Sequence, residues 1–374
     1  MQEALTEIMD LGGGRRVHLQ ERIGRGASST VFRATYELPS GLRHPVAVKA
    51  FDTMSSDEAE GILAGLGVVA SRLACVRHPN VVRIVDLGVA IARPLLVLEL
   101  VDGVSLRTLM DRYRERNARM PLDLALFVVA EILEGLSGAR TATDRNGMQL
   151  GVHHLGLTAG EVLLSFLGEV KVGDFELQTV RAGASSVRSL GAVAGRAVTL
   201  SPEIAQGDRG DARSDVFAAG VVMRELLVGP RFPKGIDNGE ALRMAREGYV
   251  QPITFQPQLS ETLIGIMRRA LAVDPEHRFP NPSAMAFELR RVALAMGVGD
   301  ARWFLRRALE LEFRTDGEVT AEVPSGQVEL LPVAELPLPP PPRPPRVFDP
   351  SDDDDTIVCL ASDVFELARE PDND

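Results

Sequence analysis

Cysteine is nearly absent from this chain. Its 374 residues include two cysteines, Cys75 and Cys359, which stand far apart and outside any metal-ligating spacing. We therefore expect neither a structural disulfide nor a cysteine metal site, as is usual for a cytoplasmic protein. The sequence also has no signal peptide and no run of about 18 apolar residues, so we expect no membrane span.

Positively charged residues are also too few to balance the negatively charged ones. The formal net charge is −11, and residues 315–374 carry a net charge of −12, so the rest of the chain is close to neutral. A nucleic-acid-binding protein needs a basic patch or stripe, and we expect no nucleic acid partner. Hydrophobic residues make up 45% of the chain, which is ample for a large core.

The hydrophobic patterns predict an α+β protein with two lobes. Residues 17–101 alternate strand-like runs with one helical stretch near 57–76, which predicts an antiparallel sheet plus one helix. Residues 102–299 predict a mostly α lobe, and residues 300–314 a possible extra helix. Residues 1–16, which contain three consecutive glycines, are expected to be a flexible leader. After residue 120, helical patterns cover residues 121–141, 214–229, 259–272, 283–296 and 300–313.

Residues 315–374 have a different composition and are predicted to be a disordered tail. The run PLPPPPRPPR at 337–346 favours extended polyproline II, which either spaces two parts of the chain or binds an aromatic groove that recognises proline motifs. Thr356 follows four aspartates and is a possible phosphosite, which a phosphopeptide-binding module would recognise. Such acidic runs also serve simply as solubilising segments.

Two segments in the first lobe suggest nucleotide binding. Residues 23–31 (IGRGASSTV) place Gly24 and Gly26 between strand-like residues, where a missing Cβ lets the backbone approach phosphates. Lys49 ends the apolar run VAVK, and a buried lysine needs a counter-charge such as a phosphate. The alternative is a strand end whose lysine reaches solvent.

With the segments that follow them, these residues resemble the eukaryotic-type (Hanks-type) serine/threonine protein kinases of bacteria. The resemblance covers about residues 17–295 and implies the two-lobed protein-kinase-like fold, with ATP and Mg²⁺ as cofactors. The later segments are VGDFE at 172–176, SPE at 201–203 and DARSDVFAAG at 211–220. By resemblance, the ATP-binding positions are Ile23, Gly24, Gly26, Val31, Ala47, Lys49, Glu99, Val101 and Leu163, and the magnesium-binding position is Asp174.

The catalytic loop departs from the family pattern. In HLGLTAGE at 154–161, Gly156 occupies the position of the catalytic aspartate and cannot accept a proton. Leu155 replaces the family's arginine, Thr158 its lysine, and Glu161 its asparagine, although a glutamate oxygen could still ligate a metal.

Two further family residues are replaced outside that loop. Val69 stands where the family has the helix glutamate that pairs with the lysine, and no acid occurs between Gly61 and Asn80. Glu176 replaces the glycine after the magnesium-binding aspartate.

Residues with architectural roles in the family are retained, namely His154, Glu203, Asp215 and Arg278. We therefore predict a pseudokinase that acts in signalling by binding other proteins, such as active kinases, with weak or no ATP binding. One alternative is a divergent active serine/threonine kinase with a rebuilt loop. Another is an adaptor that works through its proline-rich and acidic tail, with readers of phosphopeptide or proline motifs as partners.

Overall fold

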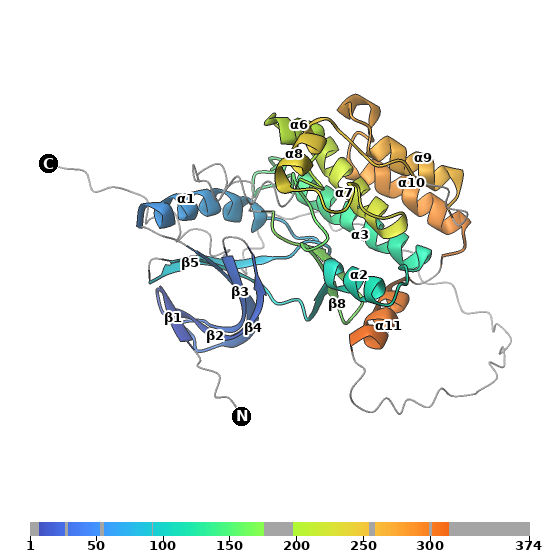
Figure 1. The fold of residues 1–374 in the computed structure, drawn as a ribbon. Helices are drawn as coiled ribbons and strands as arrows, with labels where there is room; N and C mark the ends of the chain where they lie inside the picture. Colours follow the sequence, from blue (N-terminus) through green and yellow to red (C-terminus); the bar gives the residue numbers. More distant parts are fainter. Residues whose placement is uncertain are drawn as a thin grey trace, which may run out of the picture. The chain divides into compact units, whose positions relative to one another are not determined.

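The computed structural model describes residues 7–26, 29–52, 56–91, 93–175, 197–253, 259–298 and 301–313. These residues belong to one compact unit, in which a β-rich lobe precedes a helical lobe (Figure 1). Glu176, Thr356 and the predicted tail lie outside the described residues.

An antiparallel sheet and one helix form the first lobe, which confirms the prediction for this half. The sheet has six strands in the order β1-β2-β3-β4-β6-β5, and helix α1 (Ser56–Leu73) contacts its β5 and β6 strands. The strands are β1 (Glu7–Gly12), β2 (Arg15–Arg25), β3 (Ser29–Glu37), β4 (Arg43–Phe51), β5 (Ile84–Ala90) and β6 (Arg93–Glu99).

The prediction of a flexible leader over residues 1–16 is wrong for residues 7–16. These residues form β1 and the beginning of β2, which pair as an antiparallel hairpin. Met9 and Leu11 alternate inward along β1 and are buried. The three glycines at 12–14 all have positive φ, so they make the tight turn of the hairpin rather than a flexible spacer.

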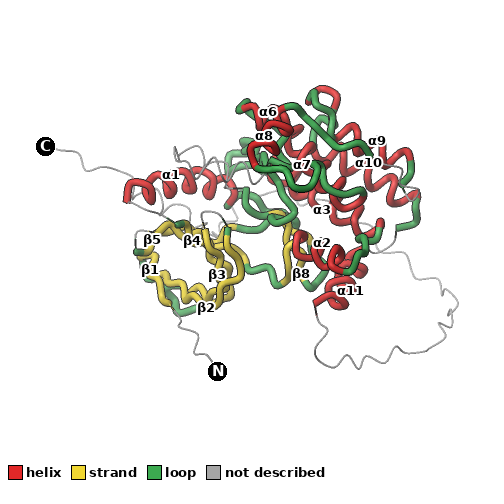
Figure 2. Tube along the Cα trace, viewed as in Figure 1, coloured by secondary structure: helices red, strands yellow, loops and turns green. Residues whose placement is uncertain are grey.

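Strand β1, which was not predicted, brings the two edge strands of the sheet, β1 and β5, together. Figure 2 shows the strands curling round a common centre. A Cβ on Gly88 of β5 would come within 3.0 Å of Leu11 Cδ2 on β1. Arg15 donates two hydrogen bonds to the Asp86 carboxylate, at 3.0 and 3.1 Å, and the Tyr36 hydroxyl donates a third at 2.5 Å. Asp86 therefore ties β5 to both β2 and β3.

Replacing Asp86 with asparagine is expected to lower the free energy of unfolding by about 2 kcal/mol, because it removes the charge from three hydrogen bonds in a largely buried cluster. Urea unfolding at pH 7 measures this loss. Glu21→Gln is the matched control, since Glu21 pairs with Arg33 on the exposed side of the same sheet and such pairs contribute at most about 1 kcal/mol. Equal losses in the two variants would show that Asp86 does not tie the sheet ends.

The second lobe is mostly helical, as predicted. Its centre is α3 (Leu122–Thr141), an apolar helix that packs against α7 (Ala212–Leu227) and α10 (Pro282–Ala295). The predicted extra helix lies at α11 (Ala301–Phe313), where Leu305 and Leu309 are fully buried. The remaining elements are β7 (Gly103–Ser105), α2 (Leu106–Glu115), β8 (Val162–Ser165), β9 (Val170–Val172), α6 (Pro202–Gln206), α8 (Asn238–Arg246) and α9 (Glu261–Ala270).

The segment after α1 anchors the first lobe to α3. Gly135 and Gly138 leave room for it, because a Cβ at either position would lie 2.5 Å from Asn80 O or from the His78 ring. Asn80 Nδ2 donates to Glu131 Oε2 and to Val170 O, both at 2.8 Å. The same side chain thus positions the β8–β9 hairpin beside α3. Among the helices of the described ranges, none combines the length and apolarity needed to cross a membrane.

Candidate nucleotide-binding and catalytic site

The glycine-containing segment forms the turn between β2 and β3. Gly24 pairs with Val31 in the sheet register, and Gly26 N donates to Ser29 O at 2.8 Å, so the chain reverses tightly there. Ile23 lies on β2 with about half of its surface exposed. The turn therefore offers backbone groups beside an open apolar side chain.

The residues expected to surround an adenine ring gather in one apolar cluster. Ala47 belongs to its buried part, and Val31, Val101 and Leu163 pack against it as partly buried members. These side chains come from β3, β4, the segment after β6 and β8. The two lobes thus both contribute to the same apolar cluster.

Glu99, at the end of β6, directs its carboxylate to neighbouring polar groups. Its Oε1 lies 3.2 Å from Lys171 Nζ on β9 and accepts a hydrogen bond from Arg83 N at 3.0 Å. The Glu99 side chain therefore helps to join the lobes, and its backbone N–H donates to Arg83 O at 3.0 Å.

Lys49 and Asp174 meet although 125 residues separate them in the sequence. Lys49 Nζ donates to Asp174 Oδ1 at 2.8 Å, and Lys49 is only 3% exposed. Asp174 has a φ of +61°, an uncommon backbone conformation for a residue other than glycine. The buried ammonium thus has a carboxylate partner from the opposite lobe.

The position on α1 that holds a glutamate in the family has no carboxylate here. Val69 is partly buried and packs against the main hydrophobic core. Glu60, the nearest acid on α1 with a described side chain, is exposed. At this position α1 therefore contributes apolar packing against the main core.

Asp215 holds the backbone of the catalytic loop. Its two carboxylate oxygens accept hydrogen bonds from His154 N at 3.0 Å and from Leu155 N at 2.7 Å. Burial raises the pKa of Asp215 to about 6. The buried His154 ring reaches Gly173 O through Nε2 at 2.9 Å and packs beside Phe175. These contacts connect the loop to the strand end that carries Asp174.

Glu161 closes the loop on itself. Its Oε2 accepts a hydrogen bond from Thr158 N at 2.7 Å, and its carboxyl group is almost completely buried. Its backbone O also accepts from Gly173 N at 2.9 Å. Gly156, two residues before Thr158, is buried and brings no side chain to the site. One oxygen of the Glu161 carboxylate is thus engaged within the loop.

Leu155 takes a left-handed backbone conformation, with a φ of +59°. Its side chain lies beside Gly210 and Ile204, because a Cβ built on Gly210 would come within 2.8 Å of Leu155 Cδ2 and 2.3 Å of Ile204 Cδ1. An apolar contact therefore occupies the place of a phosphate-binding arginine.

The Glu203 carboxylate forms a two-pronged ion pair with Arg278, at 2.8 and 2.9 Å. Ser214 Oγ adds a hydrogen bond at 2.7 Å. Burial alone would raise the pKa of Glu203, but these hydrogen bonds outweigh it and lower the pKa to about 2. This pair joins α6 to the segment before α10.

Sequence reasoning missed Arg231, a fully buried residue near the same pair. Its guanidinium donates to Val198 O at 3.0 Å and Leu200 O at 2.8 Å, and it lies over the Phe217 ring. Burial lowers its pKa to about 9. No motif marks Arg231, because its partners are backbone carbonyls from a distant segment.

The carboxylates of the site could supply only part of the coordination of a magnesium ion. Within the part of the chain that the structure describes, no three His, Cys, Asp or Glu side chains gather closely enough to hold a metal ion. Magnesium in nucleotide sites is usually held by one or two carboxylates together with phosphate oxygens. Asp174 therefore fits such an ion only when a nucleotide completes its coordination.

Comparisons with known proteins agree with this architecture. A profile of the protein tyrosine and serine/threonine kinase family matches residues 17–286. Serine/threonine-protein kinase PknB of Mycobacterium leprae is 32% identical over 295 residues, which cover 77% of this chain and 42% of that protein. Tyrosine-protein kinase MasK of Myxococcus xanthus is 29% identical over 280 residues, covering 72% and 41%. The chain thus spans less than half the length of these two relatives.

Among solved structures, the kinase domain of Mycobacterium tuberculosis PknI superposes with a TM-score of 0.54 and 20% sequence identity. The superposition covers 78% of this chain and 99% of that one. At this identity the match shows the fold, including the antiparallel sheet of the first lobe and the helical second lobe.

Proposed function

Because the chain belongs to the protein tyrosine and serine/threonine kinase family, we propose that it is a catalytically impaired member that works by binding other proteins. Active kinases are among the partners that this proposal names. The observation that carries it is the closed catalytic loop, in which Glu161 is held by Thr158 N and no carboxylate stands at Gly156.

Each departure in the loop removes a separate part of phosphoryl transfer. A group that orients and accepts the substrate proton contributes about 10²–10⁴-fold, and glycine has none. A threonine in place of lysine leaves the charge of the transferred phosphate without its cation. Leu155 packs against Ile204 and cannot pair with a phosphorylated activation segment. The combined loss is consistent with a kinase fold that has kept its architecture.

The nucleotide half of the site supports weak ATP binding. Val31, Ala47 and Leu163 provide apolar surface for adenine, and Lys49 provides a cation for phosphates. A bound Mg²⁺ would neutralise phosphate charge beside Asp174. Since Lys49 already pairs with Asp174, phosphates must compete with Asp174 for the ammonium.

A divergent active kinase is the second candidate. It is favoured by the retained Lys49–Asp174 pair and by the serine/threonine and tyrosine kinases among the relatives. In this case another acid would have to replace the missing aspartate. Glu161 is the nearest carboxylate in the loop, and its hydrogen bond to Thr158 N would have to break first.

Phosphoryl transfer from radiolabelled ATP to a generic protein substrate, with Mg²⁺ or Mn²⁺, distinguishes the two candidates. We expect the full chain to transfer no more label than Asp174→Asn, a variant that keeps the side-chain shape and removes the charge. Circular dichroism of both proteins checks that they are folded. Transfer by the natural chain that disappears in Asp174→Asn would refute the impaired-kinase proposal.

A further inference from the structure

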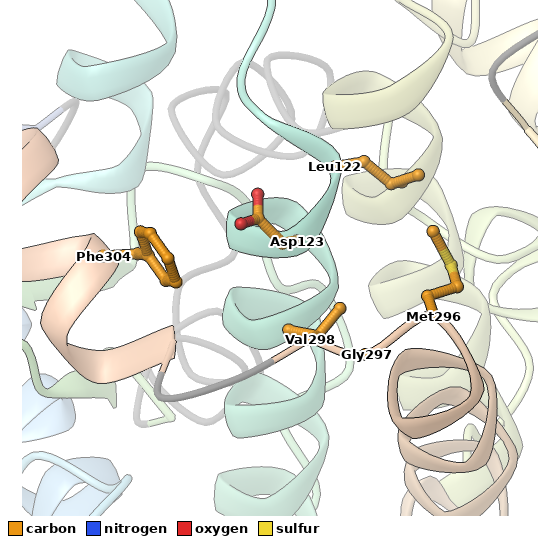
Figure 3. Close-up of a pocket in the computed structure, with 6 residues that line it drawn as sticks. All are labelled: Leu122, Asp123, Met296, Gly297, Val298 and Phe304. Atoms are coloured by element: carbon orange, nitrogen blue, oxygen red, sulfur yellow. The ribbon is translucent and has the colours of Figure 1, made fainter. Parts of the chain in front are cut away.

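A pocket of about 470 Å³ lies where three helices of the second lobe meet (Figure 3). Its lining comes from the first turn of α3, the segment that follows α10 and the first turn of α11. The lining residues are Leu122, Asp123, Met296, Gly297, Val298 and Phe304. The volume is within the range of about 300–1,000 Å³ that small-molecule sites have. None of these residues belongs to the nucleotide-binding and catalytic site.

The walls of this pocket are mostly apolar. Figure 3 shows Asp123 between the Phe304 ring on one side and Leu122 and Met296 on the other. Met296 and Phe304 are 47% and 41% exposed, so a molecule can reach them from solvent. Binding sites for small molecules typically combine such apolar walls with a small number of polar groups that orient the ligand.

Asp123 supplies the only charge of the lining. One of its oxygens accepts a hydrogen bond from Leu124 N at 2.8 Å, and no ion pair among the described residues includes Asp123. Arg302, in the first turn of α11, directs its stem to the turn between β8 and β9, because a Cβ on Gly168 would lie 2.8 Å from Arg302 Cγ. A carboxylate in a first helical turn is ordinary, since the helix dipole favours it. What distinguishes Asp123 is its place in the wall of an apolar pocket.

The surroundings of Asp123 add negative rather than positive charge. The pKa of the neighbouring Tyr113 hydroxyl is raised, first by burial and then by the charge of Glu312, with Asp123 acting in the same direction. Arg116 opposes them, but it already pairs with Glu312 at 2.9 Å. This corner of the lobe therefore favours a cation.

We propose that the pocket binds a small organic amine, with its ammonium group at Asp123 and its apolar part against Leu122, Met296, Val298 and Phe304. An ammonium–carboxylate contact is a charge-assisted hydrogen bond, and the Phe304 ring adds a surface that attracts cations. An anion would be repelled by Asp123, and a purely apolar molecule would desolvate the carboxylate without giving it a partner. This inference does not depend on whether the chain binds or turns over ATP.

Equilibrium dialysis of the full chain against 4-phenylbutylamine tests the proposal. We expect saturable binding with a Kd of about 1 mM, as is usual for a ligand of this size. The matched ligands are 4-phenyl-1-butanol and 5-phenylpentanoate, which keep the ring and stem but are neutral or negative. We expect both to bind at least about 10-fold more weakly.

Trp303 reports where the amine binds. It is the single tryptophan of the chain, and its ring packs edge-on against the Phe304 ring, with centroids 5.2 Å apart. Its fluorescence is therefore expected to change along the same saturation curve that dialysis gives.

Asp123→Asn is expected to weaken amine binding at least about 10-fold, because it removes the charge and keeps the shape. Asp237→Asn is the matched control, since Asp237 also stands at the start of a helix, α8, but outside the pocket. Asparagine is well tolerated at helix starts. Met296→Lys is a second variant, which places an ammonium on the pocket wall and is expected to exclude the amine. A lysine is favourable at this helix C-terminus, and circular dichroism checks that all three variants are folded.

Four results would overturn the amine site. No saturable binding could occur up to about 20 mM amine, well above the expected Kd. The alcohol or the carboxylate could bind as tightly as the amine. Asp123→Asn could weaken binding no more than Asp237→Asn does. Binding could also leave Trp303 fluorescence unchanged, which would place the amine elsewhere on the chain.

Discussion

Replacing Glu203 with glutamine is expected to lower the free energy of unfolding by about 3–5 kcal/mol at pH 7, the usual loss when one partner of a buried ion pair is removed. Arg278 has no exposed side-chain surface, and both of its terminal nitrogens donate to the Glu203 carboxylate. The neutral amide would leave the buried guanidinium without its counter-charge. Urea unfolding measures the loss.

The same pair makes stability dependent on pH in the acid range. The pKa of Glu203 is lowered to about 2 in the folded chain, from an ordinary value near 4.5. Its contribution is therefore fully present above about pH 4.5 and is lost as the pH falls toward 2. At this shift the contribution is about 3 kcal/mol, and Glu203→Gln is expected to remove that part of the acid dependence.

The control for both measurements is Glu240→Gln, because Glu240 pairs with Arg243 on the exposed surface of α8. Such pairs contribute at most about 1 kcal/mol. If Glu203→Gln were no more destabilising than Glu240→Gln, the pair would not fasten α6 to the second lobe.

Restoring the missing groups of the catalytic loop is expected to raise phosphoryl transfer by about 10²-fold. The variant combines Gly156→Asp with Thr158→Lys, which supplies a proton acceptor and a cation for the transferred phosphate. Gly156 is not among the residues with positive φ, and Asp215 already holds the loop backbone at His154 and Leu155. An aspartate can therefore be accommodated in the backbone geometry of this position.

The initial rate of transfer from radiolabelled ATP to a generic substrate measures the gain. Gly160→Asp with Thr158→Lys is the matched control, because Gly160 is an exposed residue of the same loop with room for a Cβ. It adds the same charges without placing a carboxylate at position 156. Equal rates in the two double variants would show that a carboxylate at position 156 does not raise transfer.

Several helices and the family could be predicted because their signals are local. The apolar spacing of α3, α7, α9, α10 and α11 repeats with the period of a helix, so each appears near its predicted range. The kinase motifs are short runs in a fixed order, and their positions identify Lys49, Asp174 and Glu203 without any knowledge of contacts. The helices α2, α6 and α8 were not predicted; α6 and α8 have only five and nine residues, which give few periods to recognise.

The β1 hairpin was missed because two signals conflicted. Three consecutive glycines are typical of a flexible segment, whereas the alternation of Met9 and Leu11 is typical of a strand. The contact of Leu11 with β5 decides between them, and that contact joins residues far apart in the sequence.

The family, the two-lobed architecture and the absence of a carboxylate at Gly156 follow from the sequence, because each depends on which residue stands at which place in a motif. The partners of the remaining charged side chains depend on the folded structure. Lys49 and Asp174 pair across 125 residues, Glu161 binds within its own loop, and Arg231 holds carbonyl groups of a distant segment. A charged residue is the same in the sequence whether its side chain faces solvent, substrate or a buried partner. Burial and distance in the folded chain determine which of these the charge meets.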